Sequence, residues 1–295
     1  LRSRTLFLNE TGDPALDAPY IEYNGFLVDR DHAPALEQRM LAFLAGDRGP
    51  DGLPDWDEIR FGGVPGRYRQ FALATGLGVR LVGANGTARV DLDAIRASAM
   101  PYLDHLSANT RHQIRRSARG YEVHGPLALD AAGTVDEAIG FLDELARLHQ
   151  AYWIGRGRPG AFAQPHMARF HRRLIAAALP DGAVELLRVR AGDHAIGYLY
   201  NLIHRGWVGA YCSGFAYAGD TKLKQGYVAY RLCNERHLAA GNRVFDFLAG
   251  DNRYKTSLGK ADQPLFHFDL QRGRPKLRIE AALLRLRDRL GGRKT

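Results

Sequence analysis

The chain has 295 residues, 45% of them hydrophobic, which is enough for a sizeable core and more than one core usually fills. No apolar run approaches the ~18 residues of a membrane-spanning helix, which argues against transmembrane proteins. The formal net charge of +9 comes mainly from arginine and fits either a GC-rich genome or an anionic partner. The two cysteines, Cys212 and Cys233, lie in apolar segments, which favours a reducing compartment, and we expect a cytoplasmic protein.

The first hundred residues predict an α/β unit with a polar, Gly- and Pro-rich middle over residues 46–66. Asp91 is expected to open a short helix that ends before Pro101, and Ser107 to cap a basic helix. That basic helix has four arginines between residues 110 and 119 but no interleaved aromatic residues. Since surfaces that stack bases need such aromatic residues, we expect no nucleic-acid partner.

The rest of the chain predicts helices and strands in an order typical of a sheet flanked by helices. We expect a mixed, largely antiparallel sheet in an α/β (α+β) fold. The expected helices cover residues 135–153, 165–178 and 227–240, and the expected strands cover residues 121–129, 183–190, 195–204, 207–215, 243–248 and 265–270.

A basic loop before the expected helix at Tyr227 suits a phosphate group. Lys222 and Lys224 stand directly before the helix, and Gly226 lets a ligand approach the backbone. The first N–H groups of a helix and its positive dipole end attract anions, so a pyrophosphate fits here. We therefore expect the cofactor to contact the residues of this loop and helix start: Lys222, Lys224, Gln225, Gly226, Tyr227 and Val228.

Several segments resemble GNAT-superfamily acyltransferases of the CelD/BcsL type, which are related to the Fem-type aminoacyltransferases. The resemblance covers residues 20 to 270 and is carried by residues 102–116, 149–162, 211–215, 245–250 and 254–255. It implies a GNAT-like fold with tandem lobes and acyl-CoA as the co-substrate. The phosphate loop departs from the family's pattern, because Leu223 replaces Gln or Arg and Val228 replaces a small residue.

On this basis we expect three parts in the chain. Residues 1–105 would form an N-terminal GNAT-like lobe, and residues 106–272 a lobe that binds acyl-CoA. Residues 273–295 would form a basic helix, with Ile279, Leu283, Leu286 and Leu290 in one apolar stripe. This stripe would pack on the body or on a second subunit, or residues 276–290 would make a peripheral membrane contact.

Direct transfer of an acyl group to an amine needs proton transfer but no protein nucleophile, so we expect no catalytic cysteine. Asp246 is a candidate proton acceptor or amine clamp, with a structural ion pair to Lys255 as the alternative. Tyr211 and Tyr254 are candidate proton donors. Backbone N–H groups near Ser213 and Gly214 would polarise the thioester carbonyl.

Four further residues complete the expected site. His149, on the face of Trp153 and beside a glycine-rich loop, is a candidate catalytic residue, or else a core histidine. Arg156 would clamp a carboxylate of the acceptor. The resemblance adds Glu22 as a substrate contact, together with Tyr254 and Lys255. His166 and His171 have the wrong spacing for a shared metal, so no metal is expected.

The expected function is N-acyltransfer, of an acetyl or longer fatty acyl group, to an amine of a sugar, amino acid or peptide. Acyl-CoA or an acyl carrier protein would deliver the group. Two alternatives stay open: an aminoacyl-tRNA-dependent transferase of the Fem type, and a non-catalytic binding module on the same fold.

Overall fold

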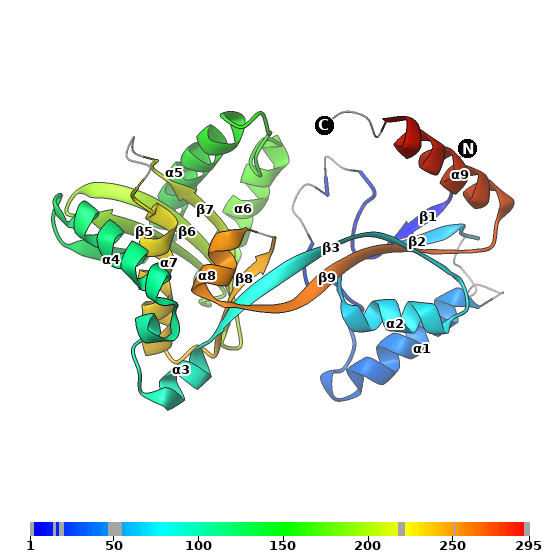
Figure 1. Cartoon of the computed structure of the whole chain (residues 1–295), viewed down its shortest axis with the longest axis horizontal. Helices are drawn as coiled ribbons and strands as arrows, with labels where there is room; N and C mark the ends of the chain where they lie inside the picture. The colour runs from blue at the N-terminus through cyan, green and yellow to red at the C-terminus, as the bar shows by residue number, and fades with distance from the viewer. Residues whose placement is uncertain are drawn as a thin grey trace. The chain divides into compact units, whose positions relative to one another are not determined.

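In the computed structural model, the chain divides into two compact units (Figure 1). The structure describes residues 3–13, 16–17, 21–46, 55–217, 222–250 and 252–291. Unit 1 contains residues 1–86 and 263–295, and unit 2 contains residues 87–262. Along the chain, the two units meet at residues 86/87 and 262/263. The sequence-based division of the chain at residues 105 and 272 stays a prediction.

Unit 1 consists of strands and helices around a small core of its own. Its strands follow the order β1-β2-β9-β3, with β1 parallel and β9 antiparallel to β2. Phe61 stacks on Phe268 in this core, and the buried carboxylate of Glu37 accepts hydrogen bonds from Arg67 and Tyr68. The elements are β1 (Thr5–Phe7), a 3-10 turn (Arg30–His32), α1 (Ala33–Ala45), β2 (Glu58–Pro65), α2 (Gly66–Ala74), β3 (Gly78–Asp91), β9 (Lys260–Gln271) and α9 (Pro275–Gly291), and β3 and β9 each extend into unit 2.

Unit 2 has a sheet with strand order β3-β8-β7-β6-β5-β4, in which only β7 and β8 are parallel. The predicted mixed, largely antiparallel sheet flanked by helices is confirmed. The elements are α3 (Leu92–Ser98), a 3-10 turn (Tyr102–His105), α4 (Ala108–Glu122), β4 (Leu127–Ala131), α5 (Val135–Ile154), α6 (Pro165–Ala178), β5 (Val184–Ala191), β6 (His194–His204), β7 (Trp207–Phe215), α7 (Gln225–Ala239), β8 (Val244–Ala249) and α8 (Arg253–Leu258).

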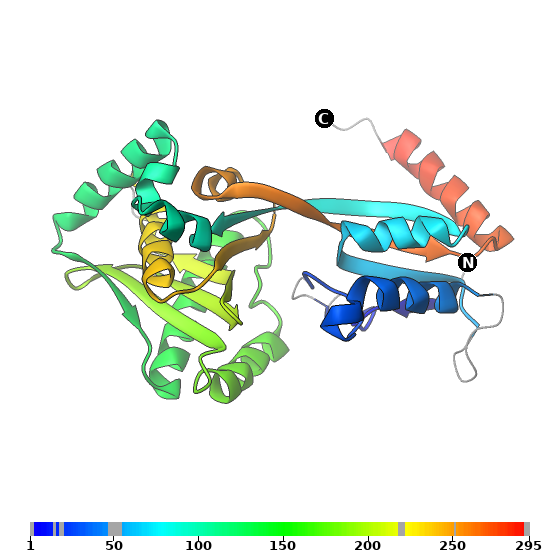
Figure 2. The ribbon, with the colours of Figure 1, turned by 90° about the horizontal axis from the view of Figure 1, so that it is seen from below.

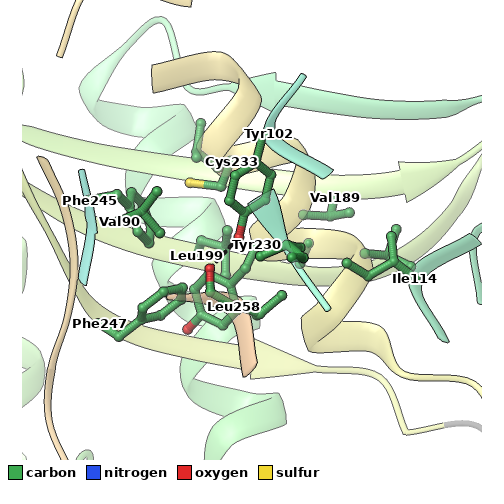
Figure 3. Packing of buried hydrophobic residues seen from close by; sticks show 14 of the residues in the cluster. Val90, Tyr102, Ile114, Val189, Leu199, Tyr230, Cys233, Phe245, Phe247 and Leu258 are labelled. Atoms are coloured by element: carbon green, nitrogen blue, oxygen red, sulfur yellow. Dashed lines mark hydrogen bonds between the residues drawn. The ribbon is translucent and has the colours of Figure 1, made fainter. Parts of the chain in front are cut away.

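Strand alternation assigns the helices of unit 2 to opposite faces of its sheet (Figure 2). On β5, Leu186 packs with α5 and α6, whereas the next residue, Leu187, packs with α4 and α7. Phe245 and Phe247 of β8 join the second cluster, where Tyr230 of α7 lies against both rings (Figure 3). Asp246, between the two phenylalanines, consequently belongs to the other face of its strand.

Most of the predicted elements agree with the structure within one or two residues, and two do not. The strand expected over residues 265–270 is longer, because β9 begins at Lys260. The strand expected over residues 121–129 is wrong, because Tyr121 continues the buried stripe of Ile114 and Ala118 at the end of α4. The strand begins only at Leu127, after Gly125 with its φ of +126°. Ser107 caps α4 as predicted, by accepting a hydrogen bond from the N–H of Thr110. Among the described residues, no helix is long and apolar enough to cross a membrane.

Candidate acyl-transfer site

The parallel strands β7 and β8 pair at only three positions and then separate. The pairing ends where Gly209 faces Asp246, although β7 continues to Phe215 and β8 to Ala249. A bulge bends β7 at the same place: Cys212 faces Tyr200 and Ala210 faces Asn201, so Tyr211 is the extra residue. Within the described part of unit 2, β7 therefore has no β8 partner beyond Gly209.

Gly214 lies where β7 passes directly against the backbone of α5. A β-carbon at this position would overlap the carbonyl oxygen of Leu145 and lie 3.0 Å from its Cα. Gly214 is therefore needed for this close approach and is not merely a turn residue at the end of the strand. The close approach fixes the end of β7 next to the middle of α5.

We expect Gly214→Ala to lower the free energy of unfolding by about 1–3 kcal/mol, the usual cost of overpacking. The reason is that the obstructing atoms belong to a helix backbone, which cannot rotate away as a side chain can. Gly209→Ala is the matched control, because its β-carbon would meet the Cδ2 atom of Leu248 at 3.3 Å and that side chain can move. Urea unfolding of both variants measures the difference, and equal stabilities would contradict the proposed close packing.

Asp246 and Lys255 both face the backbone corner that follows β8. Asp246 is fully buried, and its Oδ1 accepts a hydrogen bond of 2.7 Å from the N–H of Leu248. Leu248 has a φ of +59°, a conformation that costs a non-glycine residue free energy. The Lys255 ammonium donates to the carbonyls of Leu248 and Ala249, at 3.2 and 2.5 Å. Through these contacts, Asp246 and Lys255 both stabilise the backbone at the end of β8.

Three hydroxyl groups, those of Ser213, Tyr230 and Tyr254, lie close together on the α7 side of the sheet. The Tyr254 ring, on α8, stacks on the Tyr230 ring of α7 with centroids 5.7 Å apart, and their hydroxyls are hydrogen-bonded. Tyr230 also bonds the hydroxyl of Ser213 on β7. Burial raises the pKa of Tyr254 to about 12, so its phenol keeps its proton at neutral pH. A protonated phenol at this place can donate a proton.

The His149 ring bridges β7 and the loop that follows α5. Its Nδ1–H donates to the Ser213 carbonyl at 3.1 Å, and its Nε2 accepts from the Ala161 N–H at 3.3 Å. Burial lowers the pKa of His149, and an accepting Nε2 requires the neutral ring. The neighbouring Cys212 thiol lies 3.6 Å from Nδ1, and burial raises its pKa to about 12. Both ring nitrogens are therefore used in positioning the backbone.

The Tyr211 hydroxyl points toward α6 and away from the three-hydroxyl cluster. It lies 3.1 Å from Nε2 of His171, whose Nδ1 is 3.3 Å from the hydroxyl of Tyr200. Burial lowers the pKa of His171 to about 4, so this ring is neutral and belongs to the core beneath α5 and α6. Among the candidate proton donors, the geometry favours Tyr254 over Tyr211.

Helix α4 holds the basic segment that leads into α7. Arg116 donates to the Lys222 carbonyl at 2.9 Å, and the Lys224 N–H donates to the Ser117 hydroxyl at 3.0 Å. Leu223 packs against Gly120, where a β-carbon would meet Cδ2 of the leucine at 2.5 Å. The arginine-rich face of α4 thus has a role in shaping this segment. Residues 219–221 of the predicted phosphate loop lie outside the described residues.

The start of α7 differs from the expected one. The helix begins at Gln225, and Lys224 supplies no side-chain cap. Tyr227 and Val228 donate their N–H groups to the Lys224 carbonyl, and the Val228 side chain is fully buried. Since the amides of Tyr227 and Val228 bind the Lys224 carbonyl, the amides of the first turn that precede them are those of Gln225 and Gly226.

A pocket of about 880 Å³ lies beside this helix start, within unit 2. The Tyr152 ring stacks on the Tyr217 ring with centroids 4.8 Å apart, and the Arg156 guanidinium lies 3.6 Å from the Tyr152 centroid. Burial raises the pKa of Tyr217 to about 12. The wall consists of Arg147, Leu148, Ala151, Tyr152, Gly155, Arg156, His194, Phe215, Ala216, Tyr217, Leu223, Lys224 and Gln225.

Comparison with known proteins agrees with this geometry. The model of a family described as "Acetyltransferase (GNAT) domain" matches residues 108–256, half of the chain. The chain belongs to this GNAT family. The prediction of a GNAT fold is therefore confirmed, and β7, α7 and β8 all lie within the matched residues.

Two solved structures show the same fold over most of the chain. One is FemX, with 11% identity, a TM-score of 0.57, and coverage of 88% of this chain and 83% of that chain. The other is the C-terminal domain of a putative lysylphosphatidylglycerol synthetase from Agrobacterium fabrum, with 15% identity, a TM-score of 0.54, and coverage of 88% and 77%. The predicted relation to Fem-type proteins is confirmed at the level of fold. A search of curated proteins found no match.

The remaining predicted site residue, Glu22, lies in unit 1 and outside the GNAT domain match. Its segment docks on β2, where a β-carbon at Gly63 would overlap the Ile21 carbonyl, and Asn24 donates to the Gly62 carbonyl at 3.0 Å. A substrate contact at Glu22 stays a prediction.

Sequence reasoning missed four residues around the site of the GNAT domain: Tyr152, Tyr217, Tyr230 and His171. Tyr152 had a usable signal, because it precedes Arg156 by one helical turn and so shares its face. Tyr230 falls within the helix expected over residues 227–240. Nothing in the local sequence indicates that its hydroxyl meets those of Ser213 and Tyr254.

Proposed function

We propose that this GNAT protein is an N-acyltransferase that moves an acyl group from acyl-CoA to the amine of a small molecule or peptide. The observation that carries the proposal is the separation of β7 from β8 beside the pocket at the start of α7. The extended arm of acyl-CoA can lie along β7 beyond Gly209, where β8 no longer pairs with it. The CoA phosphates would then lie at Lys224 and the amides of Gln225 and Gly226. The pocket volume is in the range of small-molecule and cofactor sites.

The proposed chemistry is direct transfer. The amine nitrogen attacks the thioester carbon, backbone N–H groups near Ser213 and Gly214 stabilise the charged carbonyl oxygen, and the carbon–sulfur bond breaks. Tyr254 gives its proton to the leaving sulfur. Asp246 accepts the proton of the amine. Because the carboxylate is fully buried and cannot touch the amine directly, a water molecule carries the proton to it. Lys255 and His149 hold the backbone around these two groups.

The acceptor is proposed to enter at the Arg156 side of the pocket. The guanidinium already lies on the Tyr152 ring and donates to its carbonyl at 3.2 Å, which fixes its position for binding a carboxylate. This favours acceptors that carry an acidic group near the amine.

We expect acetyl-CoA, palmitoyl-CoA and free CoA each to raise the melting temperature of the protein. The double variant Lys222→Ala/Lys224→Ala should bind CoA about 10-fold or more weakly. The physical reason is the loss of two cations next to the phosphates. Calorimetric titration measures the affinity, and Lys260→Ala, an exposed lysine in β9, is the matched control.

Three outcomes would contradict this assignment. Unchanged CoA affinity in the double variant would remove the phosphate site from the start of α7. Stabilisation by aminoacyl-tRNA but by no CoA compound would favour the Fem-type alternative. Binding of CoA without acyl transfer to any amine would favour a non-catalytic module. An acyl carrier protein can be tested as a donor in the same assay.

A further inference from the structure

Helix α9 exposes an apolar stripe on the surface of unit 1. Ile279, Leu283 and Leu286 follow one another at four- and three-residue steps and are 52%, 56% and 53% exposed. Leu277 and Lys276 face the body instead: Leu277 is buried, and the Lys276 ammonium lies 2.5 Å from a carboxylate oxygen of Asp57.

The two sides of α9 thus have different tasks. The side with Leu277 and Lys276 attaches the helix to unit 1, and Glu280 adds a contact of 3.5 Å with the Ser3 hydroxyl. The other side presents three large aliphatic side chains to water. Burying these would be favourable, because each is a substantial apolar area that folding has left exposed.

The charge of the helix indicates what covers the stripe. Apart from Lys276, which is paired with Asp57, its sequence has four arginines, Arg278, Arg285, Arg287 and Arg289, against the two acidic residues Glu280 and Asp288. Helices with an apolar face and arginine-rich polar positions bind at the interface of anionic membranes, where lipid headgroups complement their charge. The net charge of +9 of the whole chain also favours its attraction to an anionic membrane surface.

A second copy of the chain fits this stripe less well. Two such helices would bring like charges together, which opposes association. Three side chains also cover far less area than the ~800 Å² per partner of a stable protein interface. We propose that α9 docks on an anionic lipid surface, with Ile279, Leu283 and Leu286 among the acyl chains and the net positive charge of the helix attracted to the headgroups. This proposal does not depend on the acyl-transfer function.

Cosedimentation with lipid vesicles tests the proposal. The protein is expected to bind vesicles of phosphatidylcholine with phosphatidylglycerol, to bind phosphatidylcholine alone much more weakly, and to be released by added salt. Leu283→Glu should lower the partition coefficient about 10-fold or more. Leu73→Glu is the matched control, because Leu73 is 53% exposed on α2 of the same unit, and it should bind as the original protein does.

A second variant separates charge from apolar insertion. Arg285→Gln/Arg289→Gln should remove most of the preference for the anionic vesicles. Equal binding to both kinds of vesicle, or full binding by Leu283→Glu, would overturn the proposal. So would light scattering that finds a dimer which Leu283→Glu converts to a monomer. Thermal unfolding of each variant shows that the loss of binding is not a loss of fold.

Discussion

Tyr254→Phe is expected to lower kcat by about 10²-fold or more while CoA binding stays unchanged. The substitution removes only the hydroxyl, so the ring stack on Tyr230 can remain. The loss follows because the sulfur must then leave as a thiolate without a proton donor, and general acids contribute about 10²–10⁴-fold. Steady-state kinetics with acyl-CoA and a saturating amine measure kcat, and titration with CoA measures binding.

Tyr211→Phe provides the matched control for Tyr254. It also removes one hydroxyl from a buried tyrosine, but that hydroxyl contacts His171 in the core beneath α6. We expect it to change stability rather than kcat. A normal kcat in Tyr254→Phe together with a large loss in Tyr211→Phe would reverse the assignment of the proton donor.

Asp246→Asn is expected to lower kcat by about 10²-fold with little change in the melting temperature. The amide keeps an oxygen that can accept the hydrogen bond from Leu248, so the corner after β8 can persist. However, the amide cannot take a proton from the amine. A loss of about 10²-fold in kcat is the scale expected when a general base is missing. Kinetics and thermal unfolding should be measured on the same preparations.

The opposite pattern would assign Asp246 a structural role. A variant that unfolds at a lower temperature but keeps its kcat when folded would mean that the carboxylate serves only the backbone corner. His149 would then be the next candidate base, and its two backbone hydrogen bonds would have to open for it to act.

Much of the fold could be predicted because its signals are local. The strand over Trp207–Phe215 and the helix over Pro165–Ala178 have the predicted bounds, since the alternation and helical spacing of near neighbours determine them. The cap at Ser107 likewise depends on a residue three positions away. The order of β7, α7 and β8, together with the resemblance, was enough to predict a GNAT fold.

The tertiary structure alone decided which side chains meet at that site. A bulge in β7 accompanies the orientation of Tyr211 toward His171. The segment before α7 is shaped by Arg116, Ser117 and Gly120, which belong to a helix about a hundred residues earlier in the chain. Gly214 is required by the backbone of α5, and the hydroxyls of Ser213, Tyr230 and Tyr254 come from three different elements. No local pattern encodes these contacts, because each depends on how distant segments pack, and packing is decided by the whole core.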